Sequence, residues 1–253
     1  MENRFGIGSV LGTGFKIWFK NFLPFMLITT LIYAPLLIWG VSVVQGELDL
    51  FKLKKIVDFA TYSAGVILLL NIFVSAALTY GVVMELQGQH ASIGACIATG
   101  LVRFFPVLGV ALLSALAVAG GFLALIVPGI IVFCMLYVST QVSVLERPGL
   151  IGALKRSREL TAGHKLEIFG LLFILGLINW GLQKVVEAVM LPDAGNPAIF
   201  DETLKRIPTY MYVDLVRAII VGSLGSVMAA VTYFQLRNEK EGTSANELAR
   251  VFE

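Results

Sequence analysis

Residues 104–145 read FFPVLGVALLSALAVAGGFLALIVPGIIVFCMLYVSTQVSVL, without a single charged side chain. A helix that crosses the hydrocarbon core of a bilayer needs about 20 apolar residues, so this run is about twice as long as one crossing. Its breakers are Gly120-Gly121 and Val127-Pro128-Gly129. The run therefore predicts two membrane-spanning helices joined by a turn at one of these two places.

Apolar segments of similar length occur along the rest of the chain. Of the 253 residues, 57% are hydrophobic and only 14% are charged, and the mean hydropathy is +0.85. Soluble domains carry about 25% charged residues, so lipid is the better solvent for this chain. We predict an all-α, polytopic membrane protein of about six transmembrane helices and exclude a soluble enzyme. The predicted spans are Asn21–Gln45, Phe59–Met84, Phe104–Val127, Pro128–Leu145, Leu166–Met190 and Met211–Leu236.

Lysine and arginine are unevenly distributed between the connecting segments. Twelve lie on the side of the two termini and six on the other side. Segments rich in these residues stay in the cytoplasm, which predicts that both termini are cytoplasmic. The chain then ends in a polar cytoplasmic tail, residues 237–253.

Three similar stretches precede the first, third and fifth spans. They are Ile7–Gly14, Ile93–Gly100 and Ile151–Arg158, and each begins with the dipeptide Ile-Gly. Their spacing of apolar and basic residues is typical of an amphipathic helix at the membrane interface. We therefore expect a threefold internal repeat within one membrane domain, residues 1–236, with units at about 1–84, 85–146 and 147–236. The alternative is chance, since the chain has 25 glycines.

The third unit also carries a family resemblance. Val127-Pro128-Gly129-Ile130-Ile131, Val144-Leu145-Glu146 and the segment ALKRSRELTAG at 153–163 resemble the membrane domain attached to some glycerophosphodiester phosphodiesterases. They are also similar to the YciC-like inner-membrane proteins of bacteria. The resemblance implies a helical, multi-pass protein of the bacterial inner membrane. It implies no reaction, because the phosphodiesterase chemistry of the fused members belongs to a separate soluble domain.

Polar side chains cluster near the outer ends of the last two spans. They are Asn179, Gln183, Lys184 and Glu187 in the fifth span, and Asp214 and Arg217 in the sixth. Ionisable groups in a membrane are costly unless they are paired or face water. If the two helices are antiparallel neighbours, Lys184 lies near Asp214 and Glu187 near Arg217. The cluster then either lines a solute or proton path, or is paired at the outer interface.

The most concentrated positive charge follows the fourth span. Its members are Arg147, Lys155, Arg156, Arg158 and Lys165. Each basic residue at the cytoplasmic interface gains about 1 kcal/mol from anionic lipid head groups, which makes this cluster a candidate lipid contact. The alternative is a topology signal with side chains that extend to the interface, and Glu159 is placed to pair with Lys155 or Arg156. A net charge of +2 does not support nucleic-acid binding.

Motifs for catalysis or for a cofactor are lacking in the sequence. The histidines are His90 and His164, and the pair of His164 with Glu167 falls short of the three or four ligands that a metal requires. We therefore predict no cofactor and a non-enzymatic protein, a scaffold or an accessory to other membrane components. Its expected partners are the bilayer, above all anionic phospholipids, and another membrane protein. The alternative is a transporter or lipid-handling protein with a polar site between the last two spans.

Overall fold

The computed structural model describes residues 5–44, 50–191 and 200–251, and the regular structure of these residues is entirely α-helical. This confirms the all-α prediction. Gln45, the predicted end of the first span, lies outside the described residues, as do both chain termini. The helices are α1 (Ile7–Lys20), α2 (Phe22–Val44), α3 (Leu50–Leu86), α4 (Ile93–Ala124), α5 (Ile126–Leu136), α6 (Ser139–Leu145), α7 (Leu150–Thr161), α8 (Lys165–Met190) and α9 (Phe200–Val251).

Six helical segments of the described chain are long and apolar enough to cross a membrane. In hydrocarbon every peptide group must be hydrogen-bonded within the protein, and a helix does this within one segment. The prediction of a polytopic membrane protein is therefore confirmed. The segments are Phe22–Val43, Lys54–Leu86, Ile93–Ala124, Ile126–Leu145, Lys165–Met190 and Arg206–Gly242.

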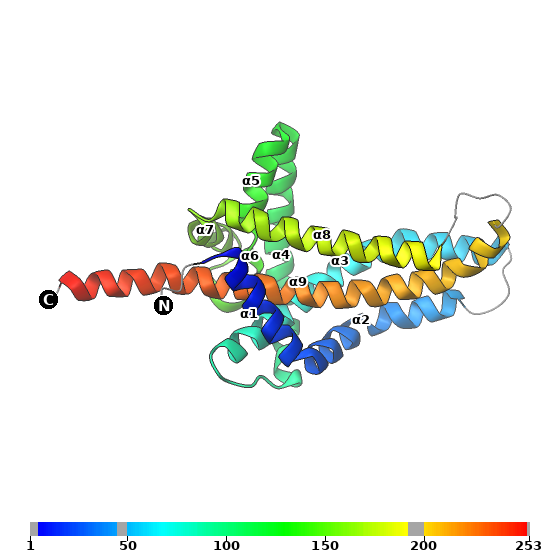
Figure 1. Ribbon diagram of the computed structural model, residues 1–253, viewed down its shortest axis with the longest axis horizontal. Coiled ribbons are helices and arrows are strands. Elements are labelled where there is room, and N and C mark those ends of the chain that lie inside the picture. Colours follow the sequence, from blue (N-terminus) through cyan, green and yellow to red (C-terminus); the bar gives the residue numbers. More distant parts are fainter. Residues whose placement is uncertain (1–4, 45–49, 192–199, 252–253) are drawn as a thin grey trace.

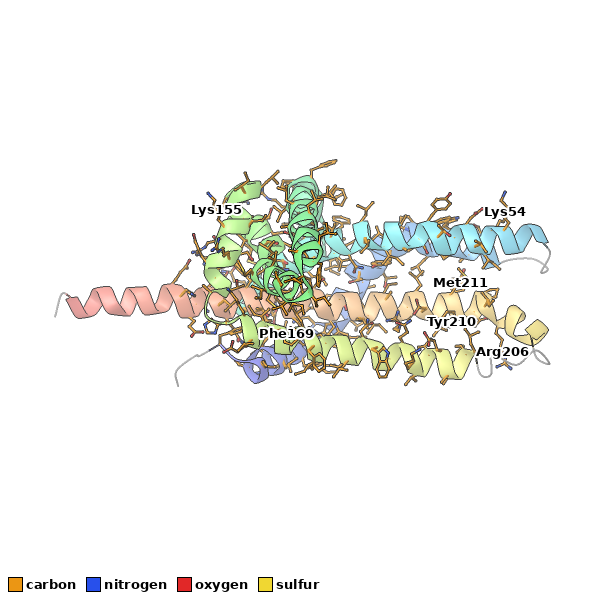
Figure 2. The ribbon with its side chains drawn as sticks, turned by 90° about the horizontal axis from the view of Figure 1, so that it is seen from above. Lys54, Lys155, Phe169, Arg206, Tyr210 and Met211 are labelled. Atoms are coloured by element: carbon orange, nitrogen blue, oxygen red, sulfur yellow. The ribbon has the colours of Figure 1, made fainter. Side chains whose placement is uncertain are left out.

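The helices run in two directions. In Figure 1, α2, α8, α9 and much of α3 follow the long axis of the molecule, whereas α4 and α5 lie across it. Figure 2 shows Lys155 of α7 toward one end of this axis and Lys54 and Arg206 at the other. We call these the α7 end and the Lys54 end. Because the lysines and arginines lie toward the two ends, the apolar middle of the bundle is the part suited to hydrocarbon.

The last helix, α9, is the centre of the bundle. It packs against α1, α2, α3 and α8. Small residues allow these close contacts: Ser223 is buried and accepts a hydrogen bond of 3.0 Å from the indole Nε1 of Trp18. A Cβ added to Gly222 would lie only 2.7 Å from Oδ1 of Asn71 in α3. Small residues on this helix thus allow α3 and α9 to pack closely.

The α4–α5 hairpin turns at Leu125, a residue that the sequence did not indicate. Leu125 is extended, with φ −169° and ψ 162°, between the end of α4 and the start of α5. The predicted breakers have other roles. Gly121 and Gly129 form the contact between the two helices, since a Cβ on Gly121 would lie 2.9 Å from Cα of Gly129. Pro128 sits in the first turn of α5, where its missing N–H costs no hydrogen bond.

Three further elements differ from the sequence-based expectation. The fourth predicted span, Pro128–Leu145, is divided into α5 and α6 by a turn at Tyr137-Val138. The repeat stretch Ile93–Gly100 is helical, but it is the first part of the long helix α4. The other two repeat stretches lie in the separate short helices α1 and α7. Positive φ angles at Gly149 (79°) and Gly163 (93°) turn the chain before and after α7. The last helix also continues beyond Leu236, where the predicted span ends.

Gly120 and Gly121 provide a matched test of the hairpin contact. A valine at position 121 forces the backbones of α4 and α5 apart, whereas the Cβ position of Gly120 has no neighbour within 4 Å. We expect Gly121→Val to lower the free energy of unfolding by about 1–3 kcal/mol and Gly120→Val to change it little. Unfolding of the purified protein in mixed micelles measures both. Equal stability of the two variants would contradict the tight hairpin.

Candidate functional site

The six polar residues predicted as a site lie on two neighbouring helices, α8 and α9, which pack against each other. Within α8, Lys184 Nζ lies 2.6 Å from Glu187 Oε2, and Gln183 Nε2 donates a 3.0 Å hydrogen bond to the other carboxylate oxygen. Within α9, Arg217 Nε donates to Oδ1 of Asp214 at 2.7 Å. Each carboxylate is thus paired with a cation three residues away on its own helix.

One hydrogen bond joins the two halves of this cluster. Arg217 Nη1 donates to Oδ1 of Asn179 at 2.5 Å, and so links α9 to α8. The Arg217 side chain is only 14% exposed. The cross-helix ion pairs expected from the sequence, Lys184 with Asp214 and Glu187 with Arg217, are replaced by pairs within each helix. The reason is geometric, because residues three apart on one helix are already neighbours.

The cluster is electrically neutral, with two cations and two carboxylates. Every charged group in it has a partner of opposite charge. Partnering lowers the cost of placing these charges near hydrocarbon. The arrangement therefore acts as a polar clamp between α8 and α9, and we call it the α8–α9 clamp.

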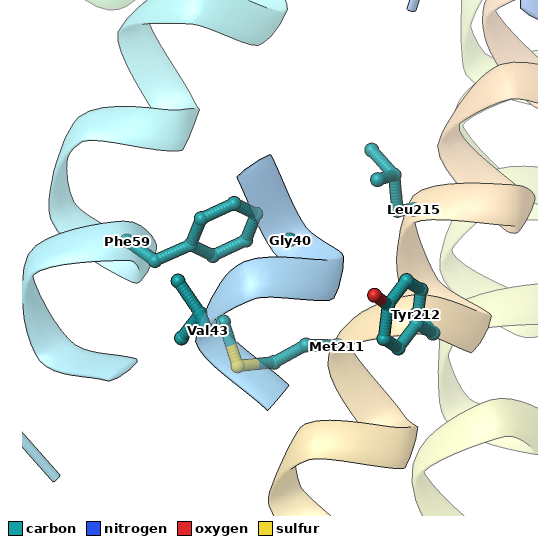
Figure 3. Close-up of a pocket in the computed structure, with 6 residues that line it drawn as sticks. All are labelled: Gly40, Val43, Phe59, Met211, Tyr212 and Leu215. Atoms are coloured by element: carbon teal, nitrogen blue, oxygen red, sulfur yellow. The ribbon is translucent and has the colours of Figure 1, made fainter. Parts of the chain in front are cut away.

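A small apolar pocket lies elsewhere in the bundle, among α2, α3 and α9 (Figure 3). Its volume is about 10 Å³, which is room for about one water molecule. An apolar lining offers a water no partners, so this pocket is a packing gap. None of the residues of the α8–α9 clamp contributes to it. The lining residues are Gly40, Val43, Phe59, Met211, Tyr212 and Leu215.

The five predicted lipid-contacting residues divide into two kinds. Arg156 is partly buried, with a side chain 28% exposed, and it is held by acidic groups. The other four are exposed, and none of them forms an ion pair within the described part of the chain. We call them the basic rim, and they are Arg147, Lys155, Arg158 and Lys165.

A network at the α7 end, which the sequence analysis missed, surrounds Arg156. Its Nε donates to Oε2 of Glu146 at 2.9 Å, and its Nη2 donates to Oε1 of Glu241 at 2.5 Å. The other oxygen of Glu146 accepts a 2.8 Å hydrogen bond from the Tyr233 hydroxyl. Arg237 completes the set by donating to Glu241 at 2.8 Å and to Tyr233 at 3.3 Å. The contact to Glu159, expected from the sequence, is the longest at 3.9 Å.

This network fixes α7 and the segment before it to α9. Burial alone lowers the pKa of Arg156, but its hydrogen bonds and charge interactions with Glu146 and Glu241 raise the pKa overall. The guanidinium therefore stays charged and acts as a structural cation. The four-residue spacing of Arg237 and Glu241 was visible in the sequence as a helical pair. The approach of Glu146 and Arg156 to α9 was not, because it depends on tertiary contacts.

Next to this network is a cavity of about 380 Å³. It opens between the end of α3, the end of α6 and the last part of α9. Its lining is mixed: polar side chains at the end of α3 and in α9, among them Gln87, Arg237 and Glu241, lie beside apolar ones. Its lining residues are Tyr80, Val83, Met84, Gln87, Leu145, Tyr233, Phe234, Arg237, Asn238 and Glu241.

Metal-ligating side chains do not gather in the described part of the chain, where no group of three or more His, Cys, Asp or Glu residues could hold an ion. His164 Nε2 lies 3.6 Å from Oε1 of Glu239, and its Nδ1 lies 4.0 Å from Oε1 of Glu167 and has no hydrogen-bond partner among the described residues. These contacts tie the start of α8 to α9. They are typical of a structural histidine.

The fold, the apolar spans and the paired charges define a class: a polytopic, all-α membrane protein. Comparisons of the chain with models of protein families, with curated proteins and with solved structures found no match. The assignment of function therefore depends on the geometry of the chain itself.

Asn179→Leu tests the α8–α9 clamp. The substitution removes the acceptor of Arg217 and leaves the Asp214–Arg217 pair intact, so we expect the free energy of unfolding to fall by about 0.6–1.7 kcal/mol, the range of interhelical hydrogen bonds in membranes. The control is Trp180→Leu on the same helix, whose side chain is 61% exposed. Unfolding in mixed micelles measures both variants. A loss confined to the control would show that Asn179 does not join the helices.

Proposed function

We propose that this protein is a non-enzymatic, multi-pass protein of the bacterial inner membrane, with both termini in the cytoplasm, that organises other membrane components at its α7 end. One observation carries the proposal. The charges in the last two spans are bound to one another, whereas the basic rim at the α7 end is exposed and unpaired within the described chain. The basic groups available for outside partners therefore gather at the α7 end, the end that this proposal assigns to the cytoplasm.

The geometry of the α8–α9 clamp favours this function over transport. A transport site must exchange its partners with the solute, so it needs groups that are free to bind. Arg217 is engaged by both Asp214 and Asn179, and Glu187 by both Lys184 and Gln183. Breaking these bonds for a solute costs stability in the bundle.

The partners that suit the basic rim are anionic phospholipids. Lys155, Arg158 and Lys165 are exposed on or beside α7, and Arg147 precedes it. Each contributes about 1 kcal/mol near an anionic surface. Arg156 is not part of this surface, since Glu146 and Glu241 hold it. A membrane-protein partner with acidic cytoplasmic segments would bind by the same chemistry.

The orientation and the cellular location rest on the sequence. The excess of lysine and arginine on the side of the termini favours the cytoplasm for the α7 end. The VPGI and ALKRS segments, which resemble those of the YciC-like proteins, favour the bacterial inner membrane. The α5 and α7 helices that carry these two segments lie in contact.

A flux measurement separates the organising function from transport. We expect proteoliposomes containing the protein to pass protons, reported by an enclosed pH-sensitive dye, no faster than protein-free liposomes. Asp214→Asn and Lys184→Gln should leave this result unchanged. Flux in the native protein that both substitutions abolish would instead establish a transporter with its site in the α8–α9 clamp.

Lipid retention tests the basic rim. We expect Lys155→Ala, Arg158→Ala and Lys165→Ala each to weaken anionic phospholipid binding about fivefold, as follows from about 1 kcal/mol per residue. Native mass spectrometry from mixed micelles counts the retained lipids. The matched control is Lys54→Ala, an exposed lysine at the opposite end. Equal losses in all four variants, or an equal loss of zwitterionic lipid, would contradict the proposal.

A further inference from the structure

The α4–α5 hairpin lies across the helices that span the bilayer. In Figure 1 it runs across α2, α8 and α9, and in Figure 2, from above, its helices again do not follow the long axis. With 32 residues, α4 is about 48 Å long. Once α2, α8 and α9 stand across the membrane, this length lies in the membrane plane.

The projecting part of the hairpin is apolar on all its faces. Every residue from Phe122 to Val127 is exposed, and the side chains of Leu116 and Leu123 are 69% and 89% exposed. Successive residues of a helix point about 100° apart, so these side chains surround the hairpin. A protein partner covers one face of a helix. Acyl chains cover every face, which identifies lipid hydrocarbon as the occupant.

The base of the hairpin sets its depth. Ser157 and Thr161 of α7 donate hydrogen bonds of 2.9 and 3.2 Å to the carbonyl oxygen of Met135, at the end of α5. On the same helix α7, Lys155 and Arg158 are exposed and need head groups or water. Packed helices lie about 8–10 Å apart, and one leaflet contributes about 15 Å of hydrocarbon. The hairpin therefore lies within the leaflet nearest α7.

The hairpin is also held together tightly enough to keep its shape. Gly121 and Gly129 bring α4 and α5 into backbone contact. Farther toward the base, the hydroxyls of Ser114 in α4 and Ser139 in α6 are 3.1 Å apart. A stiff body in one leaflet must displace lipid there and not in the other.

We propose that the α4–α5 hairpin is an in-plane wedge: it lies in the leaflet on the α7 side, surrounded by acyl chains, and enlarges that leaflet relative to the opposite one. The protein then concentrates where the membrane is convex on the α7 side. The wedge depends on the crosswise packing of α4 and α5 and not on the basic rim, so either idea can fail alone.

Depth-dependent quenching tests the position of the wedge. A fluorophore is attached to cysteines introduced as Leu123→Cys, Phe169→Cys or Val189→Cys in a Cys96→Ala, Cys134→Ala background, and quenched by lipids brominated at different acyl carbons. Phe169 lies at about the same position along the long axis as the hairpin (Figure 2), and Val189 lies near the far end of α8. We expect the fluorophore at position 123 to be quenched at the same membrane depth as the fluorophore at position 169. If the fluorophore at position 123 is instead quenched at the depth of position 189, the hairpin crosses the bilayer and the proposal is overturned.

Sorting by curvature tests what the wedge does. Labelled protein is reconstituted into giant vesicles with its α7 side outward, and its density on a tube pulled from the vesicle is compared with the flat membrane. We expect about twofold enrichment on the tube, in keeping with the curvature sensitivity of helices that lie in the interface. Equal density on the tube and the flat membrane would overturn the wedge. In the fluorescence measurement, self-quenching at position 123 that does not respond to brominated lipid would also overturn it, because it would show that a second copy covers the hairpin.

A pair of matched variants isolates the hairpin in this measurement. Leu116→Ala, Leu123→Ala and Ile126→Ala together reduce the bulk of the wedge. Phe173→Ala, Leu177→Ala and Trp180→Ala reduce exposed bulk on α8, a helix that follows the bundle axis. Enrichment should fall in the first variant and persist in the second. If enrichment on the tube falls equally in both variants, the sorting depends on the bundle as a whole and the wedge is overturned.

Discussion

Peptide groups in hydrocarbon find no hydrogen-bond partner outside the protein, and the other features of this molecule follow from that constraint. Helices meet it for the backbone, and several hydroxyl side chains in the spans meet it by bonding to the backbone of their own helix. Thr29, Thr79, Ser226 and Thr232 each donate a hydrogen bond to the carbonyl four residues earlier. Between helices, the side-chain nitrogen of Gln141 in α6 donates a 3.3 Å hydrogen bond to the Ser75 hydroxyl of α3.

The same constraint shapes the charged groups, and α9 connects the two places where they gather. Near one end of this helix, Arg217 joins it to α8 through Asn179. Near the other, Glu241 and Arg237 join it to α7 through Arg156. Between them, α9 packs on α2 and α3 through small residues. These contacts fix α9 to its neighbours at both places and make it the central support of the bundle.

The sequence predicted those parts of the fold that depend on length and composition. Six apolar runs became six long helical segments because an apolar run of this length satisfies its own peptide groups in hydrocarbon only as a helix. The direction of α4 was not predictable, since an apolar run has the same composition whether it crosses the membrane or lies within one leaflet. The hairpin turn was missed for a related reason: Gly121 and Gly129 resemble breakers but serve as a contact.

The sequence predicted which residues form the candidate site, but it did not predict which of them pair with one another. Lys184, Glu187, Asp214 and Arg217 are conspicuous because charges are rare in spans, yet which of them pair depends on side-chain reach within each helix. For Arg156, the sequence-based prediction was wrong about the role of the residue itself. It looks like one more basic residue of the lipid surface until Glu146 and Glu241, which are distant in sequence, are placed beside it.

The α8–α9 clamp is a structural contact between two helices and not the lining of a water-filled path, and hydrogen–deuterium exchange in lipid nanodiscs tests this most directly. Amides from Asn179 to Glu187 and from Asp214 to Arg217 should exchange as slowly as those of the apolar middle of α9, and far more slowly than those at the ends of α7. Fast exchange confined to these two segments would reveal a water-filled path between α8 and α9 and would contradict the account.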